Sequence, residues 1–480
     1  MLPPTDSRIV HHAFYPVFGF FSWWNLRAIS ETKSASVAVS YGIGLVNAWA
    51  ILWVAARMVF TDYRIARRVE RRSDISRGSH EYSGDGSLVS TAREQNGATK
   101  RAVAQSSSRT IPTGEDHHGQ SEYYWQTLPS GFTDRVCFVV DLLFSMRGPG
   151  WEHQARSIPG PPKEIAIQLN PSPPPTKSVV RDYADRRSLL RTNGIRFLKF
   201  QIYLDIIKTL MTHDQYFLGF VDPPAPAPSF FPNLIGQSPV LVKWYHLILS
   251  MLATRLALGM IFSLSPLFFS GLLGSKFIGL RSEPWYYSDF SGSWRYLLSD
   301  GIAGWWSAWW HQIFRLGFQA PSKWICDRFN LAPKSPGRKI IGVINAFLCS
   351  GLLHGLASIT LIPETKPWSG PFTFFLLQGL GVMIEAAAGQ AFRKAGITPK
   401  FPQFVRNIIV ILWLAIWAYF TGPFVVDDFA RGGIWLFEPV PFSFLKMLGF
   451  GEPNDHWWRW RAHNVFWYTG DRWWKSGIAV

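Results

Sequence analysis

Cysteine is scarce in this sequence, and several familiar catalytic motifs are missing from it. The 480 residues include only three cysteines, at positions 137, 326 and 349. This is too few, and they are too widely spaced, for a disulfide framework or a zinc site. Neither Gly-x-Ser-x-Gly nor His-Glu-x-x-His occurs, and there is no Asn-x-Ser/Thr sequon. The usual serine hydrolase and zinc protease mechanisms are therefore not indicated.

Charged side chains are also sparse, whereas long apolar runs are abundant. The chain is 48% hydrophobic and 17% charged, and 24 residues are tryptophan, so a soluble fold would have to bury too much aromatic surface. Uncharged runs approach or exceed the ~20 residues that span a bilayer core at residues 34–56, 256–275, 340–363, 367–384 and 407–426. They predict an all-α, multi-pass membrane protein with roughly seven to nine membrane helices and additional interfacial amphipathic helices.

The formal charge of +16 raises the question of a nucleic-acid partner. The basic residues concentrate beside the apolar runs, where the positive-inside rule places them without a polyanion. No nucleic-acid-binding motif accompanies the charge, so we expect no nucleic-acid partner. The arginines that follow the first long run place the chain after that run in the cytosol; they are at positions 57, 64, 67, 68, 71, 72 and 77.

Composition divides the chain into parts of different character. A stretch rich in Ser, Gly, Arg, Glu and Gln cannot bury enough apolar surface to fold alone, and a Pro-rich stretch at 158–177 is typical of an extended linker. Leucine and isoleucine recur every three or four residues over 188–217, which predicts an amphipathic helix. The expected parts are an interfacial or short membrane segment (1–33), a first span (34–56), a disordered basic cytosolic loop (57–130), interfacial helices with the Pro-rich linker (131–238) and a membrane-embedded core with a Trp/Arg-rich tail (239–480).

The apolar stretch at 240–275 is interrupted by Lys243, His246, Arg255 and Pro266. It is compatible with one long span or two short ones. Basic residues on both sides of it place both flanks in the cytosol, so the charge bias favours two crossings of ~18 residues each.

Two histidines are the candidates for chemistry. His311 lies among Trp305, Trp306, Trp309 and Trp310, and His354 follows 43 residues later inside the uncharged run 340–363. An ionisable side chain at membrane depth is costly and usually faces a polar cavity with a function. A neutral imidazole in apolar surroundings suits a general base near pH 7. The alternatives are a wet interfacial belt around His311 and a hydrogen-bonded structural role for His354. Metal binding is the weaker interpretation, because neither segment supplies a suitably placed carboxylate or cysteine partner.

Two short motifs give this chain a resemblance to a known family. Residues 305–312, Trp-Trp-Ser-Ala-Trp-Trp-His-Gln, resemble the Phe-Trp-Gly-Arg-Arg-Trp-His-Gln signature of membrane-bound wax synthase-like acyltransferases, including fungal O-acetyltransferases of meroterpenoids and other secondary metabolites. Residues 147–151, Arg-Gly-Pro-Gly-Trp, resemble a second motif of the fungal group. The layout is also similar to the wider membrane-bound O-acyltransferase superfamily. The chain departs from the signature at Ser307, Ala308 and Trp309, where the family has Gly-Arg-Arg.

The resemblance implies transfer of an acetyl group from acetyl-CoA to a hydroxyl of a lipophilic terpenoid or meroterpenoid alcohol, without a metal, at the endoplasmic reticulum membrane. It implies that His354 is the general base and that His311 positions the donor or stabilises the oxyanion. The expected supporting residues are Trp306, Trp310, Gln312 and Ser350, and the expected donor-binding residues are Arg315, Arg147 and Trp151. Bulky indoles beside His311 favour acetyl over a fatty acyl group. Long-chain wax ester synthesis and membrane transport are the alternatives, although no repeated halves support a transporter.

Overall fold

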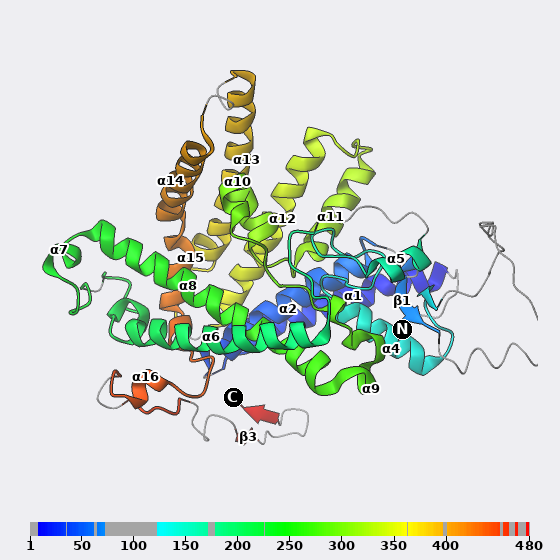
Figure 1. Ribbon diagram of the computed structural model, residues 1–480, viewed down its shortest axis with the longest axis horizontal. Helices are drawn as coiled ribbons and strands as arrows, with labels where there is room; N and C mark the ends of the chain where they lie inside the picture. The colour runs from blue at the N-terminus through cyan, green and yellow to red at the C-terminus, as the bar shows by residue number, and fades with distance from the viewer. Residues whose placement is uncertain are drawn as a thin grey trace, which may run out of the picture.

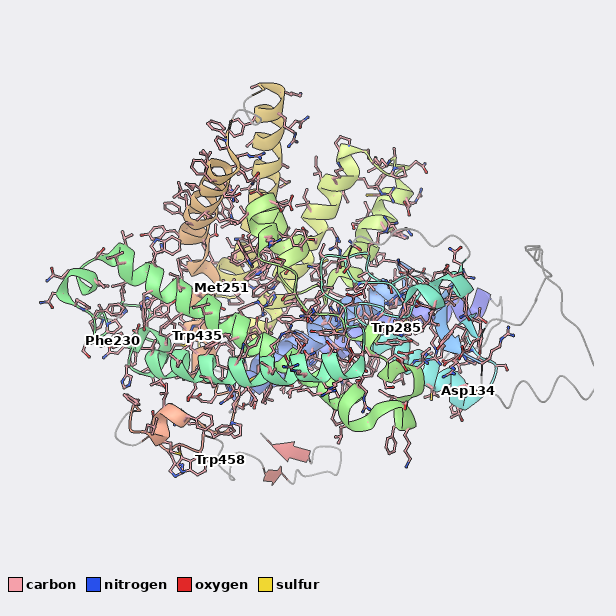
Figure 2. All side chains as sticks on the ribbon, in the orientation of Figure 1. Asp134, Phe230, Met251, Trp285, Trp435 and Trp458 are labelled. Carbon is pink, nitrogen blue, oxygen red and sulfur yellow. The ribbon has the colours of Figure 1, made fainter. Side chains whose placement is uncertain are left out.

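The computed structural model describes residues 8–34, 36–61, 65–72, 122–170, 178–224, 226–361, 363–396, 401–451, 455–459, 466–468 and 477–479. These residues are mostly helical (Figure 1), as the sequence predicts. The long axis of the molecule runs from the neighbourhood of Phe230 at one end to that of Asp134 at the other (Figure 2). Within the described residues, strands form only two small antiparallel ribbons, so the all-α prediction needs that correction.

Five helical segments of the described residues are long and apolar enough to cross a membrane, which supports an integral membrane protein. Only 6% of the most apolar window of the last segment is buried in the protein, so its side chains are available to lipid. The predicted count of seven to nine is not confirmed. The five segments are α2 (Val37–Met58), Pro239–Ser282, α12 (Pro336–Ile359), Trp368–Lys394 and α14 (Gln403–Thr421).

Helix α12 is the centre of one bundle. It begins with Pro336 in the first turn, and the Ser335 side chain accepts a hydrogen bond from the Arg338 backbone N–H, which is a favourable helix start. It packs against α2, α11 (Arg315–Arg328) and α13 (Thr373–Lys394). Figure 1 shows α11, α12, α13 and α14 rising together on one side of the molecule.

A second packing unit joins α6 (Arg186–Thr212) and α8 (Pro239–Pro266), which lie side by side (Figure 1). Asp185 caps α6 by accepting from the Ser188 N–H at 2.7 Å. Leu204, Met211 and Met260 are buried between the two helices in a cluster that also includes Trp435 (Figure 2). The helix predicted over 188–217 is confirmed, although the structure divides it into α6 and the short helix η2 (Gln215–Leu218).

The prediction of two crossings within 240–275 is wrong, because α8 continues to Pro266. Its polar residues have partners, so they do not break the helix: His246 bonds to Asp214 at 2.9 Å, and Arg255 donates to Ser291 at 2.7 Å. The chain turns later, where Gly274 and Gly279 take positive φ angles. The segments around this turn are η3 (Leu267–Leu273, a π-helix), α9 (Gly274–Ile278), η4 (Gly279–Ser282) and η5 (Pro284–Tyr286).

Strands occupy both ends of the predicted disordered loop, which corrects that prediction there. β1 (Arg68–Arg71) pairs with β2 (Tyr123–Gln126) in antiparallel register. Arg281 ties the ribbon down by donating to Glu70 at 2.6 Å and to Asp141 at 3.1 Å. Residues 62–64 and 73–121 of that loop, and residues 171–177 of the Pro-rich linker, lie outside the described residues. The neighbouring helices are α1 (Arg8–Glu31), α4 (Phe132–Phe144) and α5 (Lys163–Leu169).

The C-terminal part begins after α14 with α15 (Pro423–Arg431), so the predicted span over 407–426 ends earlier, at Thr421. Trp457 and Trp458 are exposed, as an interfacial tail requires; the rest of that tail is described only at its strands. The remaining short elements are α7 (Asn233–Gly236), η9 (Ile434–Leu436), α16 (Phe444–Met447), and the paired strands β3 (Phe466–Tyr468) and β4 (Gly477–Ala479).

Candidate active site

A kinked helix leads into the tryptophan-rich segment. α10 (Arg295–Gly304) bends at Gly301, whose φ is +53°, and continues as the π-helix η6 (Trp305–Trp309). The Glu385 carboxylate on α13 accepts from the N–H groups of Ile302 and Ala303, at 3.1 Å each. A Cβ at Gly301 would lie 1.7 Å from a Glu385 oxygen, so the kink requires glycine. The carboxylate therefore fixes the entry to η6.

Gln312 closes the loop after η6. Its buried amide donates to the carbonyl oxygens of Trp310 (2.9 Å) and Trp306 (3.3 Å). Its Oε1 accepts from Arg315 at 2.6 Å, and Arg315 also donates to the Ser307 carbonyl at 2.9 Å. Gln312 and Arg315 thus hold the backbone that presents His311.

Two tryptophans connect this loop to the membrane helices. Trp306 contacts Phe347 of α12 and Phe375 of α13, with ring centroids 5.9 and 5.5 Å away. Trp310 packs edge-on against Trp306 at 6.0 Å. Two of the predicted supporting residues, Trp306 and Trp310, therefore pack together next to His311.

His354 projects from α12 into this neighbourhood. Its Nδ1 lies 2.7 Å from the Tyr41 hydroxyl of α2, and its ring stacks on Phe375 at 4.6 Å. Phe375 also contacts Trp306, which packs on Trp310 beside His311, so a chain of aromatic contacts joins the two predicted histidines. Ser350, another predicted residue, precedes His354 by one turn of α12.

His311 is half-buried between Trp310 and Phe314. Its Nδ1 is buried and has no hydrogen-bond partner within the part of the chain that the structure describes. Burial lowers the pKa of His311 to about 4, and the cations of Arg147 and Arg255 add to this effect. The imidazole is therefore neutral at pH 7.

The Arg147 to Trp151 motif forms a buried turn. The Arg147 guanidinium donates to the carbonyl oxygens of Asp289 (2.7 Å) and Ser288 (2.8 Å). Burial lowers its pKa to about 10, so it is still a cation at pH 7. Trp151 is 2% exposed and packs edge-on against Phe138, so its side chain is enclosed by protein. The motif braces the backbone of residues 288–289.

Sequence reasoning missed Tyr41 and Glu385. Tyr41 gives no local signal, because its partner lies 313 residues away along the chain. Glu385 does give a local signal in the sequence, because a carboxylate beside an apolar run is unusual. In the described residues, no cluster of three or more His, Cys, Asp or Glu side chains is arranged to hold a metal ion.

Residues 287–377 match the model of the membrane bound O-acyl transferase family. This range includes the tryptophan-rich segment, His311 and His354. The chain is related to the membrane bound O-acyl transferases. The family expected from residues 305–312 is thereby confirmed, and the match supports an acyltransferase.

Relatives of this chain in fungi are named acetyltransferases. Acetyltransferase pyr8 of Aspergillus fumigatus is 26% identical over 31% of this chain and 35% of its own length. Acetyltransferase eriL of Hericium erinaceus is 26% identical over 32% of this chain and 38% of its own length. Acetyltransferase ataH of Aspergillus terreus is 29% identical over 28% of this chain and 45% of its own length. The matched stretch thus spans less than half the length of each relative. No solved structure matches.

Proposed function

We propose that this protein transfers the acetyl group of acetyl-CoA to a hydroxyl of a lipophilic terpenoid or meroterpenoid alcohol, in the endoplasmic reticulum membrane. The observation that carries the proposal is the pairing of His354 with Tyr41 beside His311, inside the segment that matches the acyltransferase family. The names of the fungal relatives support acetyl as the transferred group.

His354 is the proposed general base. In the tautomer with its proton on Nδ1, the ring donates to the Tyr41 oxygen and leaves Nε2 as an acceptor. Nε2 takes the proton of the acceptor hydroxyl while its oxygen attacks the thioester carbonyl. The carbon–sulfur bond of the tetrahedral intermediate then breaks. The ester is released, and the proton passes from the imidazolium to the coenzyme A thiolate.

His311 is proposed to stabilise the oxyanion of that intermediate. Its ring is neutral at pH 7 and its buried Nδ1 has no partner within the described residues, so a ring N–H can be aimed at a developing charge. Gln312, Trp306 and Trp310 would hold this ring in place through the contacts of the loop. Ser350 would line the same face of α12 as His354.

Arg315, Arg147 and Trp151 are proposed to serve the donor indirectly. Both guanidiniums donate to backbone carbonyl oxygens, and Trp151 is buried. These contacts favour shaping the donor site over touching the donor.

The test is an assay of membranes that carry the protein, with labelled acetyl-CoA and a panel of lipophilic alcohols. We expect a labelled ester from the natural chain and a loss of kcat of about 10²–10⁴-fold in His354→Ala, the usual contribution of a general base. His456→Ala, which alters an exposed histidine, is the matched control. Near-normal kcat in His354→Ala would remove the general-base role. Absence of any ester from the natural chain would contradict the function itself.

A further inference from the structure

A cavity of about 300 Å³ lies beside the tryptophan-rich segment, and none of the predicted site residues lines it. Its walls come from three parts of the chain. Arg181 lies before α6, Arg196 lies on α6 and Arg255 on α8, while the floor is the segment from Asp289 to Ser293. Basic side chains and serine hydroxyls thus converge on one space from distant positions in the sequence.

The charges of this cavity do not cancel. Arg196 donates to both carboxylate oxygens of Asp289, at 2.9 and 3.1 Å, and Asp289 also accepts from Tyr183 at 2.6 Å. The single carboxylate is therefore already matched by one arginine. Arg181 and Arg255 give the lining residues a surplus of positive charge, which favours an anion.

Arg255 is the unusual member of the group, because it lies near the middle of an apolar helix. One of its nitrogens donates to Ser291 at 2.7 Å, and its guanidinium packs over Phe290 at 4.6 Å. The other terminal nitrogen, Nη1, is buried and has no partner within the described residues. A buried donor without a partner is costly, and an arginine at such depth usually marks a functional site.

Residues that line the cavity contact the tryptophan-rich segment η6. The N–H of Gly292, on the cavity floor, donates to the carbonyl of Ala308 in η6 at 3.1 Å. A Cβ at Gly292 would lie 2.6 Å from that oxygen, so the close approach requires glycine. Arg255 also packs over Trp309 at 5.7 Å. A ligand in the cavity would therefore lie next to the segment that presents His311.

We propose that this cavity binds a phosphate group of the acyl donor, with Arg255 and Arg181 as its direct contacts and Arg196 held in place by Asp289. The inference rests on the proposed function, and it gives the donor an anchor that the sequence did not indicate. Guanidinium groups match phosphate oxygens in charge and in geometry. At about 300 Å³, the space suits one end of a large ligand, so the thioester end extends toward His311 and His354.

The experiment compares acetyl-CoA with S-acetylpantetheine, which carries the same thioester without phosphate. We expect Arg255→Gln to raise the KM for acetyl-CoA about 10- to 100-fold, as loss of a charge-assisted hydrogen bond does. Its kcat/KM for S-acetylpantetheine should stay within about twofold of the natural chain. Arg191→Gln, an exposed arginine on α6, is the matched control.

Several outcomes separate the possibilities. An equal loss with both donors would overturn the proposal, since it would mean that Arg255 acts only on the fold or the thioester end. If anionic lipid vesicles change the activity loss of Arg255→Gln by the same factor with both donors, the cavity binds a lipid headgroup. That result would also overturn the proposal. If Arg255→Gln does not accumulate in membranes, Arg181→Gln provides the same comparison, because Arg181 also lines the cavity and its side chain is exposed. Failure of the natural chain with both donors would instead contradict the proposed function.

Discussion

At the scale of single residues, the hydrogen bond between Tyr41 and His354 defines the centre. Tyr41→Phe removes the hydroxyl that lies 2.7 Å from Nδ1 but keeps the ring that packs on Phe429. We expect kcat to fall about 10- to 100-fold, because one buried hydrogen bond orients the base, while the donor KM changes little. Steady-state kinetics with acetyl-CoA measure this, with Tyr419→Phe as the control. An unchanged kcat would mean that the ring is positioned by stacking alone.

His311 makes the stability of the protein depend on pH. Its pKa is about 4 in the folded protein, below the ordinary value of 6.5, so the unfolded chain binds the proton more readily. Above about pH 6.5, His311 is neutral in both the folded and the unfolded chain and does not affect the free energy of unfolding. As the pH falls from 6.5 toward 4, protonation of His311 in the unfolded chain progressively lowers that free energy. Thermal unfolding in detergent should show this loss, and His311→Gln should reduce it. An identical pH profile in the variant would contradict the buried, neutral state.

The sequence could predict the two histidines but not their partners. The cost of an ionisable group at membrane depth singles out His354, and the run of tryptophans draws attention to His311. Tyr41 and Arg255 belong to helices whose contacts with the site depend on tertiary packing, which no local pattern encodes. The arginines predicted to bind the donor, Arg315 and Arg147, donate to backbone carbonyl oxygens, which the sequence did not indicate.

At the scale of elements, the kink in α10 is held by a carboxylate from α13. Gly301→Ala would place a methyl group against Glu385 and strain a backbone at φ +53°. We expect a destabilisation of about 2 kcal/mol or more, together with reduced kcat, because η6 is displaced. Gly342→Ala in α12 is the matched control, since nothing lies within 4 Å of its Cβ position. Thermal unfolding and turnover of the two variants, measured side by side, test this; equal behaviour would show that the kink can relax.

Elements were predictable where apolar composition alone determines them. The apolar runs near α2, α12 and α14 give helices of about the expected extent. The two crossings expected in 240–275 fail because hydropathy counts Arg255 and His246 as interruptions, whereas hydrogen bonds let the helix pass through them. The β1–β2 ribbon was missed because Arg281 and Asp141, which hold it, lie far away in the sequence.

At the scale of the whole molecule, the packing of aromatic rings around the centre bears on acyl chain length. Trp306 packs on Trp310 and Phe375, and these two rings contact His311 and His354 respectively. We expect acetyl-CoA to outcompete palmitoyl-CoA in a mixed assay, because the rings occupy the volume that a fatty chain would need. Trp310→Ala should raise the palmitoyl share of the product. Preferential formation of the palmitoyl ester by the natural chain would favour a wax ester synthase.

The hydrogen bond between Tyr41 and His354 can form only after both α2 and α12 have been synthesised. Tyr41 leaves the ribosome 313 residues before its partner. Helix α2 must therefore wait in the bilayer until α12 arrives, and only then is the polar imidazole satisfied. A chain that stops before α12 lacks His354, the proposed base, and a transplanted 287–377 segment has His354 without Tyr41. A unit moved into another scaffold would therefore need helix α2 together with residues 287–377, because that segment carries both histidines but not Tyr41.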